Sequence, residues 1–292
     1  MAAVVFFSLA LLFLLWLVGQ PWLTERKRQR IRARPFPAEW RDILKRRVPY
    51  VRAMPADLQL QLKAHIQVFL AEKAFIGCDG LEITNEIRVT VAAQACLLIL
   101  NRASFYYPEL RQILVYPSSF VVKREHTDGV GIKHSGRQVL AGESWSNGQV
   151  VLSWHDTLEG AAVPDDGNNV VIHEFAHQLD QEKGVANGAP LLARRAHYRR
   201  WSQVLNAEYR ALQARIRFRH EPVRYPANEG MTAAQGQVLE DPLFSDYGAT
   251  DPAEFFAVVS EVFFERPARM AQEHAALYQE LARFYRLDPL SW

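Results

Sequence analysis

Residues 171–180 read VIHEFAHQLD. This stretch places His173 and His177 four positions apart, with Glu174 beside the first. A helix turns about 100° per residue, so side chains four apart lie on one face and a single metal ion can reach both imidazoles. Asparagines precede the stretch and a glycine follows it, which is typical of a capped helix. The sequence therefore predicts a helix that presents a pair of metal ligands.

The surroundings of the two histidines favour a metal site over an ordinary helix. Their neighbours are apolar on nearly every side: Val170, Val171, Ile172, Phe175, Ala176 and Leu179. An imidazole pair without partners would be costly to bury among such residues. Asp180 lies seven positions after His173 on the same face, where a carboxylate can fix the tautomer of an imidazole. The alternative is a helix whose histidines are surface or satisfied core residues.

The H-E-x-x-H spacing also supplies a base. Zinc prefers imidazole nitrogen and carboxylate oxygen, and a catalytic zinc site leaves one position open for water. The metal lowers the pKa of that water to about 7. Glu174, next to the first ligand, can then accept its proton before attack on a peptide carbonyl. We expect one Zn²⁺ per chain, with His173 and His177 as ligands and Glu174 as general base.

A third ligand is sought in a second apolar helix. Residues 251–267, DPAEFFAVVSEVFFERP, carry three carboxylates that lie within about 20° of one line on a helix: Glu254, Glu261 and Glu265. The spacing does not distinguish Glu254 from Glu261, and Glu265 is less favoured because it adjoins the end. Glu254 also has another explanation, since with Asp251 it forms a capping box.

The N-terminus predicts a membrane anchor. Residues 2–19, AAVVFFSLALLFLLWLVG, carry no charge, and continued to Leu23 they are long enough to span about 30 Å of hydrocarbon. A cleaved signal peptide typically has basic residues before the apolar run and an A-x-A cleavage site after it, and neither is present. The basic run ERKRQRIRAR follows at once. Positive residues stay in the cytoplasm, which predicts a single pass of the inner membrane with the catalytic domain in the cytoplasm.

Three parts of the chain are expected. They are a transmembrane signal anchor (1–23), a basic juxtamembrane linker (24–36) and a zinc metallopeptidase domain (37–292). The formal net charge of the whole chain is only +2, so no global field favours nucleic acid, and the basic run is expected to contact anionic headgroups. With only two cysteines, Cys78 and Cys96, a disulfide-stapled fold is not expected, and both are predicted to be reduced core residues in helical segments.

The pattern of residues 37–292 predicts an α+β domain that is mostly helical with a small β-sheet. Helical patterns cover 37–75, 84–101, 190–217, 251–267 and 268–285. Strand-like runs, β-branched and bounded by turn residues, cover 112–122 and 148–154, with a Gly-rich loop or hairpin between them. Residues 220–246 show no periodicity, and the sequence leaves open whether they form a lid.

Several motifs in order resemble a known family. HEFAHQLD and YGATDPAEFFAVVSEVFF, together with the upstream GLEITNEIRVTVAAQACLLIL and GQVVLSWHD, resemble the Mlc titration factor A (MtfA) family of zinc metallopeptidases. Its catalytic core is similar to that of the anthrax lethal factor protease, which implies a zincin-like domain. The resemblance covers roughly residues 37–290. It implies that Glu254, in the DPAE motif, is the third metal ligand. It also implies that Tyr247, seven residues earlier, assists catalysis by hydrogen-bonding the developing oxyanion.

The resemblance also implies candidate functions. The first is a zinc peptidase with aminopeptidase-like action on short peptides. The second is a regulatory protein that sequesters a glucose-responsive transcriptional repressor, with the metal site mainly structural. A third candidate comes from the H-E-x-x-H pattern and not from the resemblance: a metal-dependent hydrolase of non-peptide amides, because the pattern does not dictate the acyl group. The expected partners are a peptide substrate, the membrane and, through the resemblance, a repressor, with no direct binding of nucleic acid.

Overall fold

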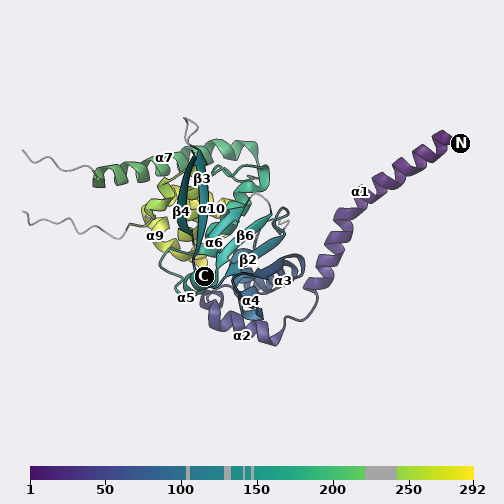
Figure 1. Ribbon diagram of the computed structural model, residues 1–292, viewed down its shortest axis with the longest axis horizontal. Coiled ribbons are helices and arrows are strands. Elements are labelled where there is room, and N and C mark those ends of the chain that lie inside the picture. Colours follow the sequence, from purple (N-terminus) through teal and green to yellow (C-terminus); the bar gives the residue numbers. More distant parts are fainter. Residues whose placement is uncertain (103–105, 128–132, 141, 146–147, 221–241) are drawn as a thin grey trace, which may run out of the picture.

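The computed structural model describes residues 1–102, 106–127, 133–140, 142–145, 148–220 and 242–292. Its centre is a four-stranded sheet of order β1-β2-β6-β5, against which helices pack (Figure 1). Strands β1 (Ala74–Gly77), β2 (Gln112–Tyr116) and β6 (Gln149–Ser153) run parallel, and β5 (Gly142–Trp145) runs antiparallel to β6. A separate antiparallel pair joins β3 (Phe120–Thr127) and β4 (Lys133–Leu140), and these strands take up most of the described part of the Gly-rich stretch.

The two central strands are built from β-branched and aliphatic residues that face the core. In β2, Ile113 and Val115 are fully buried while their neighbours are only half-buried, and in β6 Val150 and Leu152 are fully buried. In β2, alternate side chains thus enter the core, as a strand with one packed face requires. The register pairs Ile113 with Val150 and Val115 with Leu152.

The helices before β2 pack on one side of the domain. They are α2 (Ala38–Arg47), α3 (Ala56–Glu72) and α4 (Asn85–Leu97), with a short 3₁₀ turn at Pro49–Arg52. The helix expected to reach residue 75 ends at Glu72, because Ala74–Gly77 pair with β2 instead. Both cysteines are free, as predicted, but Cys78 follows β1 and does not lie in a helix.

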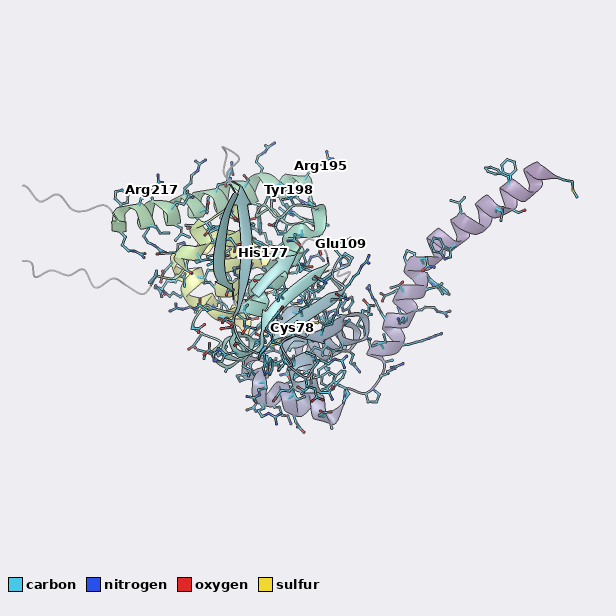
Figure 2. The ribbon with its side chains drawn as sticks, viewed as in Figure 1. Cys78, Glu109, His177, Arg195, Tyr198 and Arg217 are labelled. Atoms are coloured by element: carbon cyan, nitrogen blue, oxygen red, sulfur yellow. The ribbon has the colours of Figure 1, made fainter. Side chains whose placement is uncertain are left out.

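The later helices carry and surround the predicted site. Directly after β6 comes α5 (Trp154–Ala162), a helix that the sequence pattern did not show, followed by α6 (Val170–Asp180) and a 3₁₀ turn at Gln181–Lys183. Then come α7 (Arg195–His220), α8 (Pro252–Glu265), α9 (Pro267–Glu273) and α10 (Ala275–Tyr285). Short 3₁₀ turns lie at Asp246–Ala249 and Pro289–Ser291. Side chains fill the body between these helices and the sheet, and His177 lies among them (Figure 2).

The N-terminal helix α1 (Ala2–Arg32) corrects one prediction. Among the residues that the structure describes, no helix is at once long enough and apolar enough to cross a membrane, so the predicted N-terminal transmembrane helix is wrong. A span needs about 20 consecutive apolar residues, whereas the unbroken run of described side chains in α1, residues 19–32, contains Glu25 and five basic residues. The end of α1 packs on the body instead: Ile31 is buried, and Arg28 Nε lies 2.8 Å from Glu72 Oε1.

Candidate metal centre

Two capped helices position the candidate ligands. At the start of α6, Asn169 Oδ1 accepts a hydrogen bond of 3.0 Å from Ile172 N. At the start of α8, Asp251 Oδ1 accepts bonds from the amides of Ala253 and Glu254, at 2.8 and 3.0 Å. Each cap satisfies amides that the first turn leaves without a partner and thereby fixes where the helix begins. His173 and Glu254 consequently both lie in the first turns of their helices.

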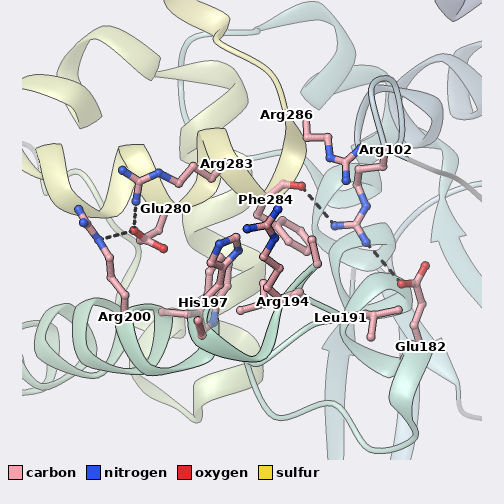
Figure 3. Close-up of a pocket in the computed structure, with 14 residues that line it drawn as sticks. Arg102, Glu182, Leu191, Arg194, His197, Arg200, Glu280, Arg283, Phe284 and Arg286 are labelled. Atoms are coloured by element: carbon pink, nitrogen blue, oxygen red, sulfur yellow. Dashed lines mark hydrogen bonds and ion pairs between the residues drawn. The ribbon is translucent and has the colours of Figure 1, made fainter.

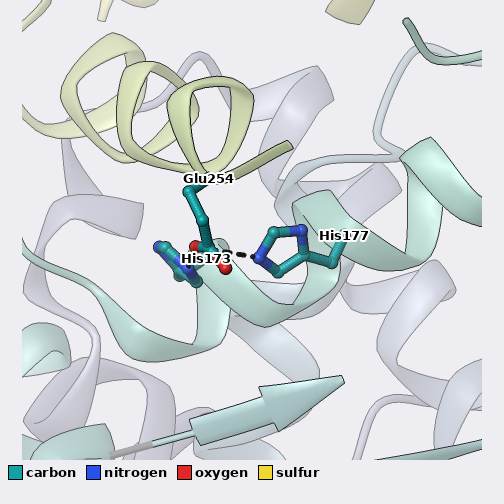
Figure 4. Close-up of side chains that lie close together, drawn as sticks. All are labelled: His173, His177 and Glu254. Carbon is teal, nitrogen blue, oxygen red and sulfur yellow. Dashed lines mark hydrogen bonds and ion pairs between the residues drawn. The ribbon is translucent and has the colours of Figure 1, made fainter. Parts of the chain in front are cut away.

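The structure brings His173, His177 and Glu254 together (Figure 4). Glu254 Oε2 lies 3.0 Å from His173 Nε2 and 3.4 Å from His177 Nε2. One ligand atom from each residue lies within 4.8 Å of the others, and the side chains are largely buried. The arrangement offers two imidazole nitrogens and one carboxylate oxygen, the donors that zinc prefers in catalytic sites.

Glu261 holds the opposite side of the His173 ring. Its Oε1 lies 2.7 Å from His173 Nδ1, and its Oε2 accepts a hydrogen bond of 2.5 Å from Asn169 N. A carboxylate accepts, so Nδ1 donates the proton of that contact and Nε2 is left facing Glu254. Glu261 is therefore the residue that fixes the tautomer and orientation of His173, a role that carboxylates commonly play behind metal-bound histidines.

A cation fits between His173 and Glu254 on electrostatic grounds. With Nδ1 protonated, a neutral His173 would turn a lone pair toward a carboxylate oxygen 3.0 Å away, and two acceptors so close repel unless a proton or metal ion lies between them. Burial lowers the pKa of His173, but the charges and hydrogen bonds of Glu261 and Glu254 outweigh it and raise that pKa well above its ordinary value. A metal ion would take the place of this proton.

The pKa values of the two carboxylates nearest the histidines, Glu254 and Glu174, shift in opposite directions. Burial raises the pKa of Glu254, but its hydrogen bonds with His173 and His177 outweigh this and hold that pKa well below the usual range. Burial raises the pKa of Glu174 to about 7. In the part of the chain that the structure describes, the buried Oε2 of Glu174 has no hydrogen-bond partner. A buried acceptor left unsatisfied is uncommon, and beside a metal site it suits a group that handles a proton.

Asp180 does not play the role expected of it. Its Oδ2 accepts hydrogen bonds from Asn187 N and Gly188 N, at 2.7 and 2.6 Å. Asp180 therefore ties the end of α6 to the segment that follows, and burial raises its pKa. The segment in turn passes close to α8, since a Cβ added at Gly188, whose φ is +74°, would lie 2.4 Å from the carbonyl oxygen of Pro252. Only glycine fits there without strain.

Glu265, the third acidic residue of α8, lies away from the histidines in the hydrogen-bond network. It accepts bonds from Asn169 Nδ2 at 2.9 Å and from Gly167 N at 3.1 Å, and burial raises its pKa to about 9. Asn169 thus bonds Glu265, Glu261 and Gly160 O while capping α6. The sequence indicated Asn169 only as a cap, because its other partners come from distant segments.

Tyr247 lies next to the candidate ligands. It belongs to the 3₁₀ turn before α8, and its ring centroid is 5.9 Å from that of His173. The side chain is 40% exposed, so it is open to an incoming substrate. Gly248 allows this turn to approach α8, because an added Cβ there would lie 3.3 Å from Val258 Cβ. Most of the predicted loop, residues 221–241, lies outside the described residues, and with it the question of a lid.

Replacing Glu261 by glutamine is expected to weaken metal binding about 10–100-fold. Both oxygens of Glu261 face donors, so an amide must turn its NH₂ toward one of them and leave that bond unmade. The unmade buried bond should also lower the free energy of unfolding by about 1–3 kcal/mol. Competition with a chromogenic zinc chelator measures the first effect and urea denaturation the second. Glu82→Gln, at an exposed position outside every candidate metal group of the described residues, is the control, and equal affinity in both variants contradicts the role given to Glu261.

Comparison with known proteins finds one matching protein family and several similar proteins. The family described as glucose-regulated metallo-peptidase M90 matches residues 22–286. An uncharacterized protein of Synechocystis is 38% identical over 291 residues, which cover 99% of this chain and 98% of that protein. Mlc titration factor A of Salmonella agona is 34% identical over 251 residues, 86% of each chain, and that of Serratia proteamaculans is 32% identical over 255 residues, 87% of this chain and 88% of the relative.

Proposed function

Because the chain belongs to the MtfA family of M90 metallo-peptidases, we propose that it is a zinc-dependent peptidase that acts on short peptides in the manner of an aminopeptidase. The observation that carries the metal-dependent part is the convergence of two imidazoles and one carboxylate from α6 and α8. The preference for short peptides rests on the family resemblance. Three residues would hold the ion: His173, His177 and Glu254. When bound, zinc supplies a Lewis acid that acidifies water and polarises a carbonyl.

Glu174 carries the proton in this proposal. Its side chain leaves α6 beside His173, is 5% exposed, and keeps Oε2 without a partner among the described residues. A pKa of about 7 is near the value at which one group can both accept and release a proton at neutral pH. Glu174 takes the proton of the attacking water at Oε2 and passes it to the amine that leaves. Burial among apolar residues keeps bulk water from competing for that proton.

Tyr247 stabilises the oxyanion that forms on the scissile carbonyl. Its ring beside His173 places a phenol at the open edge of the site. Tyr247→Phe keeps the ring and removes only the hydroxyl, so kcat is expected to fall about 100-fold. Metal content should not change, because Tyr247 is not one of the ligands. Steady-state kinetics and elemental analysis of the same preparation test this, and loss of metal along with activity would contradict an oxyanion role.

Metal removal tests the reaction class. Treatment with 1,10-phenanthroline is expected to abolish cleavage of an alanine p-nitroanilide, and stoichiometric Zn²⁺ should restore it, because the donor set suits zinc better than Mg²⁺ or Ca²⁺. The N-acetylated substrate is the matched control for specificity. An aminopeptidase needs the free amine and should leave the acetylated substrate intact. Cleavage that survives the chelator would rule out the metal-dependent mechanism.

A second candidate function comes from the relatives' name, Mlc titration factor A. We propose as the alternative that this chain binds a transcriptional repressor, with the metal site holding the shape of the binding surface. The two proposals differ in what the chelator does. Tight capture of a repressor by metal-free protein, without cleavage of any amino-acyl substrate, favours the binding role. Metal-dependent cleavage without capture favours the peptidase.

A further inference from the structure

A cavity lies outside the metal centre. Its volume is about 1030 Å³, and its walls come from the segment that leads into α7, the first turns of α7 and the end of α10, with Arg102 and Glu182 on a further side (Figure 3). None of the five proposed site residues lines it. The cavity is large enough for a compact small molecule.

The walls of this cavity are strongly cationic. Five arginines line it, against two glutamates: Arg102, Arg194, Arg200, Arg283 and Arg286, with Glu182 and Glu280. In Figure 3 Arg200 and Arg283 meet Glu280 on one side, Arg102 and Arg286 lie on the other, and Arg194 lies between them. So many like charges repel one another, and an anion placed among them relieves that repulsion.

Three of the arginines already have partners. Arg102 lies 3.4 Å from Glu182 and donates a bond of 3.5 Å to Phe284 O. Arg200 and Arg283 share the buried carboxylate of Glu280, at 2.7 and 2.6 Å.

The other two arginines, Arg194 and Arg286, have no acidic partner within the described ranges of the chain. Both side chains are exposed to solvent. They line the cavity from different elements, since Arg194 directly precedes α7 and Arg286 directly follows α10. Within the described residues they are therefore the two guanidiniums of this cavity that remain available to anionic oxygens, which guanidinium groups can bind in a bidentate manner.

The floor of the cavity is apolar and rigid. Trp201 is 2% exposed and Phe284 is 7% exposed. Trp201 donates its indole N–H to Gly188 O at 2.9 Å, and the guanidinium of Arg102 lies 4.0 Å from the centroid of the Phe284 ring. These bonds fix the floor and leave it little hydrogen-bonding capacity. The floor therefore cannot solvate a bare inorganic ion, and the accessible apolar surface of the cavity is that of Leu191, which is 49% exposed.

The start of α7 adds a further positive contribution. Residues Ala196 and His197, in its first turn, line the cavity. The amino end of a helix of this length carries a partial positive charge and amide groups that attract anions. The charged rim, the apolar floor and the helix terminus all favour the same kind of ligand.

We infer that this cavity binds a compact organic polyanion, with two or more phosphate or carboxylate groups on a short carbon skeleton. Arg194 and Arg286 contact the anionic groups, and the exposed apolar side chain of Leu191 contacts the skeleton. Binding requires no metal, because the ligands of the metal centre lie outside the cavity.

Isothermal titration calorimetry with two probes tests this inference. Fructose 1,6-bisphosphate represents phosphates and citrate represents carboxylates, so the stronger binder identifies the anionic group. Arg194→Ala and Arg286→Ala are each expected to weaken binding about tenfold, the loss of a charge-assisted bond. Arg199→Ala is the matched control, since Arg199 is exposed on α7 but does not line the cavity. Because both cavity arginines are exposed, the variants should fold with unchanged melting temperature.

Two further outcomes decide the inference. Binding should persist in Glu254→Ala, which separates this cavity from chelation at the metal centre and from the peptidase proposal. A bound ligand links segments far apart in the chain and should raise the melting temperature of the wild-type protein. The inference is overturned if neither probe binds, or if Arg199→Ala weakens binding as much as Arg194→Ala and Arg286→Ala do.

Discussion

Glu254→Ala is expected to leave the protein folded but unable to retain metal through dialysis. Within the described part of the chain, Glu254 is the carboxylate that contacts Nε2 of both His173 and His177. Without it, the two imidazoles would hold an ion alone. The affinity should therefore fall by more than the about 10–100-fold that loss of an outer carboxylate causes. Elemental analysis of dialysed protein measures the effect, with Glu261→Ala as the comparison.

The fold should survive this substitution. The cap of α8 is made by the Asp251 side chain to backbone amides, including that of Glu254, and needs no Glu254 side chain. An acidic residue in the first turn of a helix contributes only about 0.3–1 kcal/mol. Circular dichroism should thus show native helix content at neutral pH. If Glu261→Ala loses the metal while Glu254→Ala retains it, the third ligand has been assigned to the wrong residue.

Glu174→Gln is expected to lower kcat about 10²–10⁴-fold, the usual contribution of general acid–base catalysis, while metal content stays at the wild-type level. Glutamine has nearly the same shape as glutamate and can occupy the same buried position. It cannot accept a proton from water at neutral pH, so the step assigned to Glu174 fails. Kinetics with the alanine p-nitroanilide and elemental analysis on the same sample separate chemistry from metal binding.

A matched control shows whether the loss of kcat is specific to Glu174. Glu159→Gln makes the same chemical change at an exposed position of α5 and should leave kcat unaltered. Removing the charge of Glu174 should not destabilise the fold, because burial already opposes its ionisation and raises its pKa to about 7. Near-normal cleavage by Glu174→Gln would exclude Glu174 as the base and require another proton acceptor.

Glu254 and Glu261 have different positions relative to His173, and the sequence pattern alone could not predict which of them is the third ligand. Seven residues separate them, so both fall on one face of α8, and periodicity alone cannot choose. Along the helix axis, however, they lie about 10 Å apart. The crossing of α6 over α8 brings Glu254 to Nε2 of His173 and Glu261 to Nδ1. One carboxylate thus faces the Nε2 atoms of both histidines, where the proposed metal would lie, and the other orients the ring.

The other wrong predictions also arose because contacts with distant segments override the local sequence pattern. Residues 74 and 75, the first half of β1, were assigned to the end of a helix because so short a strand carries little pattern, and pairing with β2 makes them part of a strand. Asp180 shares a face with His173, yet the amides of Asn187 and Gly188 return to it. The apolar N-terminal run suggested a span, but no helix among the described residues is long and apolar enough for one, and the charged end of α1 packs on α3 through Arg28 and Glu72.

Local information in the chain was enough to establish α6, its N-cap and the spacing of His173 and His177, whereas α6 ends at Asp180 and the expected Gly184 follows the 3₁₀ turn instead. Helix geometry and capping depend on residues at most a few positions apart, so they can be read from sequence. The partners of each ring nitrogen, and the cationic cavity beside α7, depend on residues about 80 to 190 positions apart. Packing between helices sets those contacts, because burial of the shared apolar core fixes which faces meet.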